Sequence, residues 1–241
     1  MFAYLNKCFE KLKKDHILWV PYLFYCLFFS LVNKYVFKGL ESLGIKEFFI
    51  FYLENVCQTI VGILFILMVV NLKDKSLDLY YILGLLKQRL NQKLIRFSIV
   101  ANIPIVFLIF SVTYISANNS TADSINAFLL ILFVIIGLYV VVPFVAFGYF
   151  SIIAYVLHDK HYFELIKEVI LFCFKHYRLC IRWFTFILLI NSISIFILPI
   201  TLTDFIMRDL IVSTFQSVFL TLSMLYSYYF YKDNVSKYIL S

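Results

Sequence analysis

Residues 127–157 read AFLLILFVIIGLYVVVPFVAFGYFSIIAYVL, and no charged side chain interrupts these 31 positions. A helix crosses the hydrocarbon core of a bilayer with about 20 apolar residues. At 1.5 Å per residue, a helix over the whole run is about 46 Å long, so it must tilt, kink or protrude. The proline at position 143 favours a kink. The run therefore predicts a membrane-spanning helix that bends at Pro143.

Five further apolar runs are long enough to cross a bilayer: 17–33, 48–71, 97–116, 183–203 and 210–231. The whole chain is 63% apolar and only 15% charged, with a mean hydropathy of +0.92. A soluble domain is apolar at about half of its positions. We therefore expect an all-α integral membrane protein with six transmembrane helices, folded as one polytopic domain over residues 1–241.

The basic residues gather in every second gap between these runs. Of 21 lysines and arginines, 17 lie in residues 1–16, 71–96 and 158–182 and in the tail after residue 231. Basic residues stay in the cytoplasm when a helical hairpin inserts. The pattern predicts a multi-pass protein with both termini cytoplasmic, in a cell membrane, most simply the bacterial cytoplasmic membrane. The net charge of +7 then belongs to one membrane face, where it attracts anionic lipid, and does not indicate nucleic-acid binding.

Two cytoplasmic segments, 74–96 and 159–182, have apolar residues at helical spacing with charged residues between them. They align without gaps at an offset of 86, so that Asp78 meets Glu164 and Arg89 meets Lys175. We therefore predict two interfacial amphipathic helices in a parallel repeat: unit one over 16–96, unit two over 97–182, and a terminal hairpin over 183–231. Such repeats either form a substrate site at mid-bilayer or duplicate a packing unit.

The basic side chains of these two segments are candidates for contacts with lipid headgroups or with a protein partner. They are Lys73, Lys75, Lys87, Arg89, Lys93, Arg96, Lys167, Lys175, Arg178 and Arg182.

Polar groups inside the spans are few. Glu54 is the only carboxylate at any depth, and it either reaches the outer interface or coordinates an ion or substrate. Asn191 on the fifth run and Gln216 on the sixth are uncharged, and such side chains usually bridge helices. His158 with His161, and Cys173, His176 and Cys180, do not follow a zinc-binding pattern. We expect no metal, no cofactor and no catalytic constellation, and therefore a protein that is not an enzyme.

Two strings carry a resemblance to a known family: Lys75-Ser76-Leu77 through Arg96-Phe97, and Val142-Pro143-Phe144 through Arg182-Trp183. They resemble the membrane-domain family of glycerophosphoryl diester phosphodiesterases and its free-standing six-span relatives. The resemblance implies that a hairpin of spans is followed, twice, by a cytoplasmic amphipathic helix. It implies no catalysis, because no phosphodiesterase domain follows the last span. The string Phe9-Glu10-Lys11-Leu12-Lys13-Lys14 is also similar to the start of six-span permease subunits of ABC-type exporters.

Three functions remain open from the sequence. The first is a non-enzymatic polytopic protein that scaffolds or modulates a membrane partner or lipids through its cytoplasmic amphipathic helices. Its partners would be the lipid bilayer and either another membrane protein or a second copy of the chain. The alternative is the permease subunit of a transporter energised by a separate ATPase chain. A self-contained channel or enzyme would depend on Glu54.

Overall fold

A computed structural model describes residues 2–35, 45–71, 84, 92–118, 127–158, 160–197 and 205–239, with the backbone alone for parts of these helices such as 107–118 and 127–138. All regular structure in these residues is helical, which confirms the all-α class. The elements are α1 (Phe2–Lys14), η1 (His16–Trp19), α2 (Val20–Tyr35), α3 (Ile45–Asn71), α5 (Gln92–Asn118), α6 (Ala127–Leu157), α7 (Tyr162–Lys175), α8 (Tyr177–Ile197), α9 (Phe205–Asn234) and α10 (Ser236–Ile239).

The described residues of each of the six apolar runs are helical, and α6 has the same bounds as the run that predicted it. Within the described residues, three segments are long and apolar enough to cross a membrane: Phe48–Asn71, Tyr139–Leu157 and Leu210–Asn234. A fourth is added if α1 and the following η1 and α2, which are bent by 105° relative to it, together form one broken span. A protein with several membrane-capable helices is therefore confirmed, whereas six spans and their orientation stay predictions.

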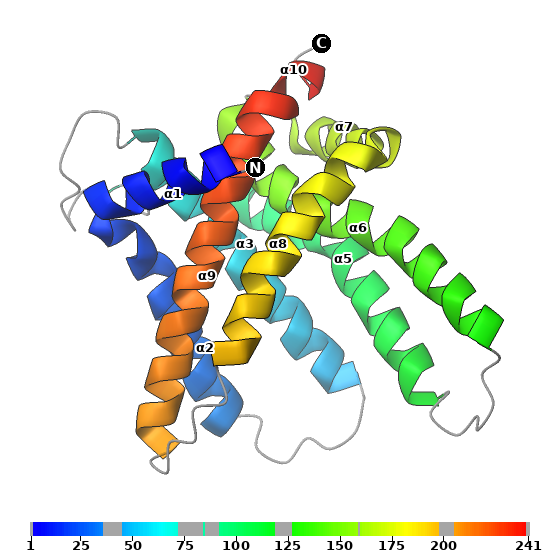
Figure 1. Cartoon of the computed structure of the whole chain (residues 1–241), viewed down its shortest axis with the longest axis horizontal. Coiled ribbons are helices and arrows are strands. Elements are labelled where there is room, and N and C mark those ends of the chain that lie inside the picture. The colour runs from blue at the N-terminus through cyan, green and yellow to red at the C-terminus, as the bar shows by residue number, and fades with distance from the viewer. Residues whose placement is uncertain are drawn as a thin grey trace.

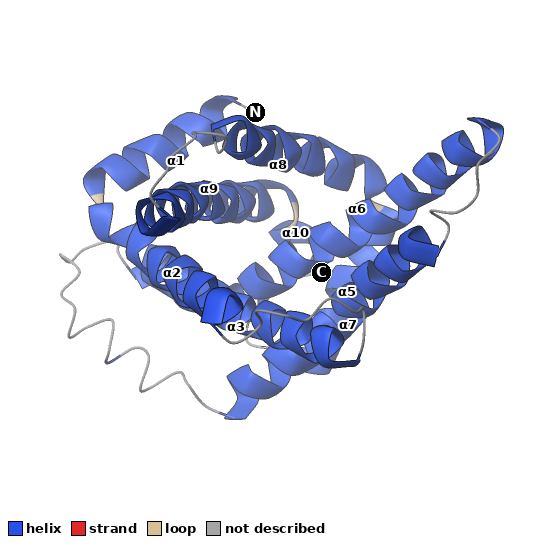
Figure 2. Cartoon of the chain, turned by 90° about the horizontal axis from the view of Figure 1, so that it is seen from below, coloured by secondary structure: helices blue, strands red, loops and turns tan. Residues whose placement is uncertain are grey.

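Both chain termini lie at the same end of the bundle, together with α1, α7 and α10 (Figure 1). Helix α9 is central, because it packs against α1, α2, α3, α6 and α8. Seen from the opposite end, α9 lies between α8 and α2 (Figure 2). Small side chains allow this close approach of several helices. On α9 they form a buried series of hydroxyl residues, namely Ser213, Ser217, Thr221, Ser223 and Ser227.

An aromatic core joins α6, α8 and α9. The fully buried Trp183 donates its indole N–H to Ser227 Oγ at 3.0 Å and packs edge-on against Tyr149. Phe150 stacks on Phe230, and Phe186 on Tyr226. Aromatic pairs contribute about 0.5–1.5 kcal/mol beyond their buried area. The core therefore fixes the relative positions of the three helices near the end that carries the termini.

The second amphipathic segment forms α7, which packs on α6 through Leu165, Val169 and Cys173 and leaves Lys167 and Lys175 exposed. The segment is not one helix, because the backbone leaves helical geometry at His176 (φ −106°, ψ 40°) and α8 begins at the next residue. The turn redirects the chain into α8 six residues before the span predicted from the sequence.

Most of the first amphipathic segment, 74–96, lies outside the described residues, and its last five residues open α5. The parallel repeat is therefore not tested. Helix α6 continues through Pro143 without a break in its helical assignment, so the kink also stays a prediction.

Candidate functional site

Helix α1 lies across the bundle because of its two faces. Cys8 is buried against the bundle and Leu5 and Leu12 are half-buried, whereas Lys7 and Lys14 are exposed. The amide of Asn234, at the end of α9, donates to the Tyr4 hydroxyl at 3.2 Å. Asp15 then breaks the helix, and the chain turns by 105° into η1 and α2. A helix of this kind lies along a membrane surface more readily than it crosses.

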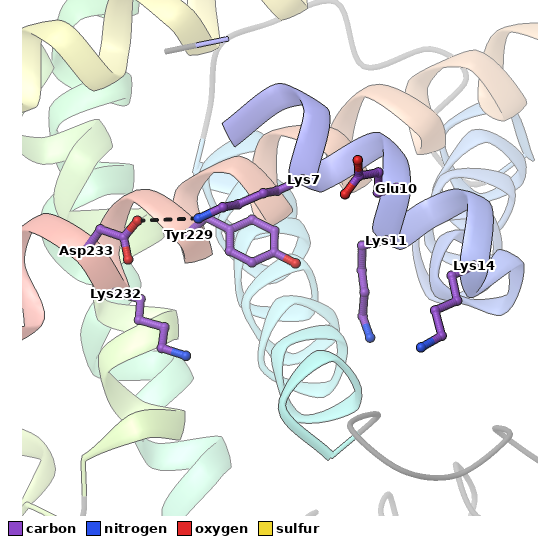
Figure 3. A pocket seen from close by; sticks show the side chains of 7 residues that line it. All are labelled: Lys7, Glu10, Lys11, Lys14, Tyr229, Lys232 and Asp233. Carbon is purple, nitrogen blue, oxygen red and sulfur yellow. Dashed lines mark ion pairs between the residues drawn. The ribbon is translucent and has the colours of Figure 1, made fainter. Parts of the chain in front are cut away.

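One flank of α1 and the end of α9 enclose an open cavity of about 380 Å³, which we call the α1–α9 cleft. Its lining residues are Lys7, Glu10, Lys11, Lys14, Tyr229, Lys232 and Asp233. In Figure 3, Lys7 reaches across the Tyr229 ring toward Asp233, while Lys11 and Lys14 extend side by side from α1. Four lysines face two carboxylates here, so the cleft is electropositive.

Ion pairs hold part of the cleft in place and leave part of its charge free. Lys7 Nζ is 3.9 Å from Asp233 Oδ2, and Lys11 Nζ is 2.8 Å from Asp15 Oδ2. Among the described residues, Lys14 and Lys232 have no ion-pair partner. Lysine is a compact, hydrated charge that binds phosphate without demanding one geometry. The cleft therefore offers unpaired ammonium groups to an anionic ligand.

Of the basic residues predicted to contact lipid or a partner, the described ones are all exposed on α5, α7 or α8: Lys93, Arg96, Lys167, Lys175, Arg178 and Arg182. Lys73, Lys75, Lys87 and Arg89 lie outside the described residues. The cleft lysines were not among the predicted site residues. Their spacing at positions 7, 11 and 14 places them on one helix face and could have identified them.

The three polar residues predicted inside the spans do not come together in the described part of the chain. Glu54 is half-buried on α3, and its backbone carbonyl accepts a 3.5 Å hydrogen bond from the Tyr25 hydroxyl. Gln216 is exposed on α9. The backbone of Asn191 belongs to α8, and its side chain lies outside the described residues.

A second cavity, of about 180 Å³, lies between α3, α5, α6 and α9, and we call it the mid-depth pocket. Its polar lining residues are Asn55, Gln58, Thr59, Asn102 and Tyr149. The buried Asn102 amide donates to Thr59 Oγ1 and to the carbonyl of Ser98, each at 2.7 Å. A scan of the sequence for charged residues within spans does not find these side chains. Their spacing on α3, three and four residues apart, is nevertheless typical of one helix face.

A third polar cluster connects the ends of α6, α7, α9 and α10. His158 Nε2 and the Tyr231 hydroxyl are 2.9 Å apart, and Lys160 Nζ donates to Glu168 and to the carbonyl of Ile239. Burial and the nearby Lys160 lower the pKa of His158, so its imidazole is neutral at neutral pH. The cluster is a structural joint between helix ends.

The histidines and cysteines of this region do not form a metal site within the described residues. Cys173 and Cys180 are both fully buried, and burial holds the pKa of the Cys173 thiol well above its usual range. Such a thiol stays protonated and behaves as a small apolar group.

Comparison of the chain with models of known protein families, with characterised proteins and with solved structures gives no match. The resemblances to the phosphodiesterase membrane domain and to permease subunits therefore stay hypotheses.

Proposed function

We propose that this chain is a non-enzymatic membrane protein that binds anionic phospholipid headgroups in the α1–α9 cleft. Its exposed basic surface on α5, α7 and α8 then contacts a partner protein or, more weakly and one basic residue at a time, further headgroups. The observation that supports the proposal most directly is the placement of four lysines around one cavity of about 380 Å³ at the end of the bundle that holds both termini.

The position of α1 agrees with this function. The helix is bent by 105° from α2, so if α2 crosses the bilayer, α1 lies nearly in the plane of the membrane surface. Each basic residue near an anionic leaflet contributes about 1 kcal/mol of attraction. A phosphate that enters the cleft meets several lysines at once, whereas a headgroup at an isolated surface lysine meets only one.

In this proposal α2, α3, α5, α6, α8 and α9 are six transmembrane helices, and both termini are cytoplasmic. The orientation can be tested in cells with single cysteines labelled by a membrane-impermeant maleimide, after the five native cysteines are replaced. A cysteine at position 237 should react only in opened vesicles, whereas one at position 120 should react from outside. Reaction at position 237 in intact cells would overturn the orientation.

The lipid proposal is tested with purified protein in nanodiscs of phosphatidylglycerol and phosphatidylcholine in equal parts. The association of spin-labelled phosphatidylglycerol, relative to spin-labelled phosphatidylcholine, measures headgroup preference. Changing Lys7, Lys11, Lys14 and Lys232 to Gln should reduce this preference about tenfold, since each lysine contributes about 1 kcal/mol before screening.

The matched control changes four exposed basic residues outside the cleft, Lys167, Lys175, Arg178 and Lys237, to Gln. It removes the same charge and should reduce the preference less than threefold. A four-lysine to four-arginine variant of the cleft should retain the preference, because charge is kept. Equal losses from the cleft and control variants would mean that the whole basic surface acts as one field, and would refute a specific cleft.

A second candidate function is the membrane subunit of a transporter whose ATPase is a separate chain. The polar mid-depth pocket favours it, because transporters place substrate sites near the centre of the bilayer. Affinity purification from native membranes in a mild detergent distinguishes the two functions. Stoichiometric recovery of a nucleotide-binding chain would support the transporter, and recovery of this chain with phospholipid alone would exclude it.

A further inference from the structure

The mid-depth pocket lies at the same depth on every helix that forms it. Thr59 is 12 residues from the end of α3, Asn102 is 10 from the start of α5, Gly148 is nine from the end of α6, and Met224 is 10 from the end of α9. All four of these helix ends belong to the end of the bundle with the termini. At 1.5 Å per residue the pocket lies about 14–18 Å from that end. This distance matches half the thickness of the hydrocarbon core of a bilayer, which is about 30 Å.

Hydrogen bonding within the pocket is incomplete. Both N–H groups of Asn102 are used, which leaves its side-chain carbonyl as an acceptor without a donor in the described residues. Asn55 uses one N–H, toward the carbonyl of Phe51, and Gln58 makes no hydrogen bond in the part of the chain that the structure describes. At this depth no bulk water can satisfy these groups, and leaving them without partners is costly.

The Asn102–Thr59 bond already serves as a contact between α3 and α5, as amides in membrane helices usually do. That contact does not use the side-chain amide of Gln58 or the remaining polar groups of the Asn55 amide. Both side chains line the cavity beside the contact. The remaining lining is mostly apolar, including Ile105, Val145 and Ile152, with the hydroxyl-bearing Tyr149 among them, and no charged side chain lines the pocket. Free amides together with aliphatic carbons match a ligand that has a polar, hydrogen-bonding part and an apolar part.

The size of the cavity limits this ligand. A dry cavity of about 150 Å³ in a protein interior holds one benzene ring. The pocket, at about 180 Å³ and partly open, therefore accommodates a ring-sized group of a ligand. Because no charge lines it, an ionised group would be held at mid-bilayer without compensation. A neutral group that both donates and accepts hydrogen bonds would satisfy the free amides.

We propose that the mid-depth pocket is a binding site for an uncharged, ring-sized group with a hydrogen-bond donor and acceptor, carried by a membrane-soluble molecule. Gln58 and Asn55 bind its polar side, and Ile105, Val145 and Ile152 pack on its apolar side. The site shares no residue with the α1–α9 cleft, so this inference does not depend on lipid binding there, although it rests on the proposed transmembrane placement of α3, α5, α6 and α9.

The test uses two photoreactive probes in vesicles that contain the full chain. One is a benzamide with a trifluoromethyldiazirine on its ring, and the other is toluene with the same diazirine. Labelled positions are mapped by mass spectrometry. The benzamide probe should label α5 and α6 near Ile105 and Ile152, and unlabelled benzamide should compete with it. Gln58→Leu should lower the competed labelling about fivefold, as expected for a lost hydrogen bond.

Gln216→Leu is the matched control, because Gln216 is exposed on another spanning helix and outside the pocket. It should leave labelling within twofold of the native chain. Equal labelling by the toluene probe, without competition by benzamide, would overturn the proposal and leave an apolar crevice. Conversion of a dimer to a monomer by Gln58→Leu, measured by light scattering, would also overturn it, since the amides would then join two copies. Neither outcome affects the lipid preference of the cleft.

Discussion

The α1–α9 cleft and the mid-depth pocket are both polar cavities, but they are built in opposite ways. The cleft is open, lies at the end of the bundle and is lined by side chains with full charges, part of which are neutralised by ion pairs. The pocket lies partway along the bundle and is lined by neutral amides, of which Asn55 and Asn102 donate to backbone carbonyls. Water solvates charged side chains at the surface. At mid-bilayer a charged group has a high free-energy cost, and a neutral polar group has a moderate one. Depth therefore determines which ligand chemistry each cavity can have.

The largest effect is expected in the aromatic core between α6, α8 and α9, at Trp183, which lines neither cavity. Trp183→Ala removes a fully buried ring and the hydrogen bond to Ser227, and should lower the free energy of unfolding by about 3–5 kcal/mol. Denaturation by sodium dodecyl sulfate in mixed micelles measures this change. Trp183→Phe retains most of the ring contacts and should cost less than half as much. Equal costs would mean that the hydrogen bond, and not the packing, joins α8 to α9.

The second largest effect is a difference in the salt sensitivity of ligand binding between the two cavities. The Debye length falls from about 10 Å at 0.1 M salt to about 3 Å at 1 M, so charge attraction in the open cleft is screened. Between these concentrations the preference for phosphatidylglycerol should decrease about fivefold or more. Labelling of the mid-depth pocket by the neutral benzamide probe should change less than twofold. Equal salt sensitivity of both measurements would contradict the assignment of charge to one cavity and neutrality to the other.

A smaller change should affect the pocket alone. A Cβ at Gly148 would lie 3.0 Å from Ile105 Cδ1, the flexible end of a side chain that also lines the cavity. Gly148→Ala should therefore push Ile105 into the pocket and reduce benzamide-competed labelling about two- to threefold, while the lipid preference stays unchanged. Gly84→Ala is the control, since Gly84 is exposed and a Cβ there meets nothing within 4 Å. Unchanged labelling in Gly148→Ala would mean that the probe binds elsewhere.

The helical architecture could be predicted from the sequence because apolar runs and charge alternation are local signals. The run over 127–157 has the bounds of α6, and each of the other five runs overlaps one long helix. The break at His176 was not predicted, because the apolar periodicity of α7 continues smoothly into α8. The central position of α9 was not predicted either. Its serines and threonines are unremarkable in sequence and matter only because other helices pack against them.

Neither cavity could be assembled from the sequence. The cleft combines Lys7 and Lys14 with Lys232, from opposite ends of the chain, and only the packing of α1 on α9 brings them together. The pocket combines Asn102 with Thr59, 43 residues away. A search for charged residues in the spans identifies Glu54, which is not part of the pocket lining. The sequence shows that the lining residues from one helix share a helix face. Which helices then pack together to form a cavity is known only from the fold.

The smallest effect concerns His158, which connects the end of α6 to α9 through Tyr231. Burial, together with Lys160 and against the opposing charge of Glu168, lowers the pKa of His158 below its ordinary value of 6.5. As the pH falls below about 6.5, the unfolded chain therefore binds a proton before the folded one, and stability decreases until the folded imidazole is also protonated. Above that range the contribution is constant.

Between about pH 7.5 and about pH 5, the melting temperature of the native chain should fall about 2 °C more than that of His158→Gln, since His158 is only half-buried. His161→Gln is the control, because it removes an exposed imidazole from the same loop and leaves the contact between His158 and Tyr231 in place. If His158→Gln changed the lipid preference and the pocket labelling together, the joint between α6 and α9 would couple the two cavities. Unchanged values of both would establish that the cavities are independent, as their separate linings predict.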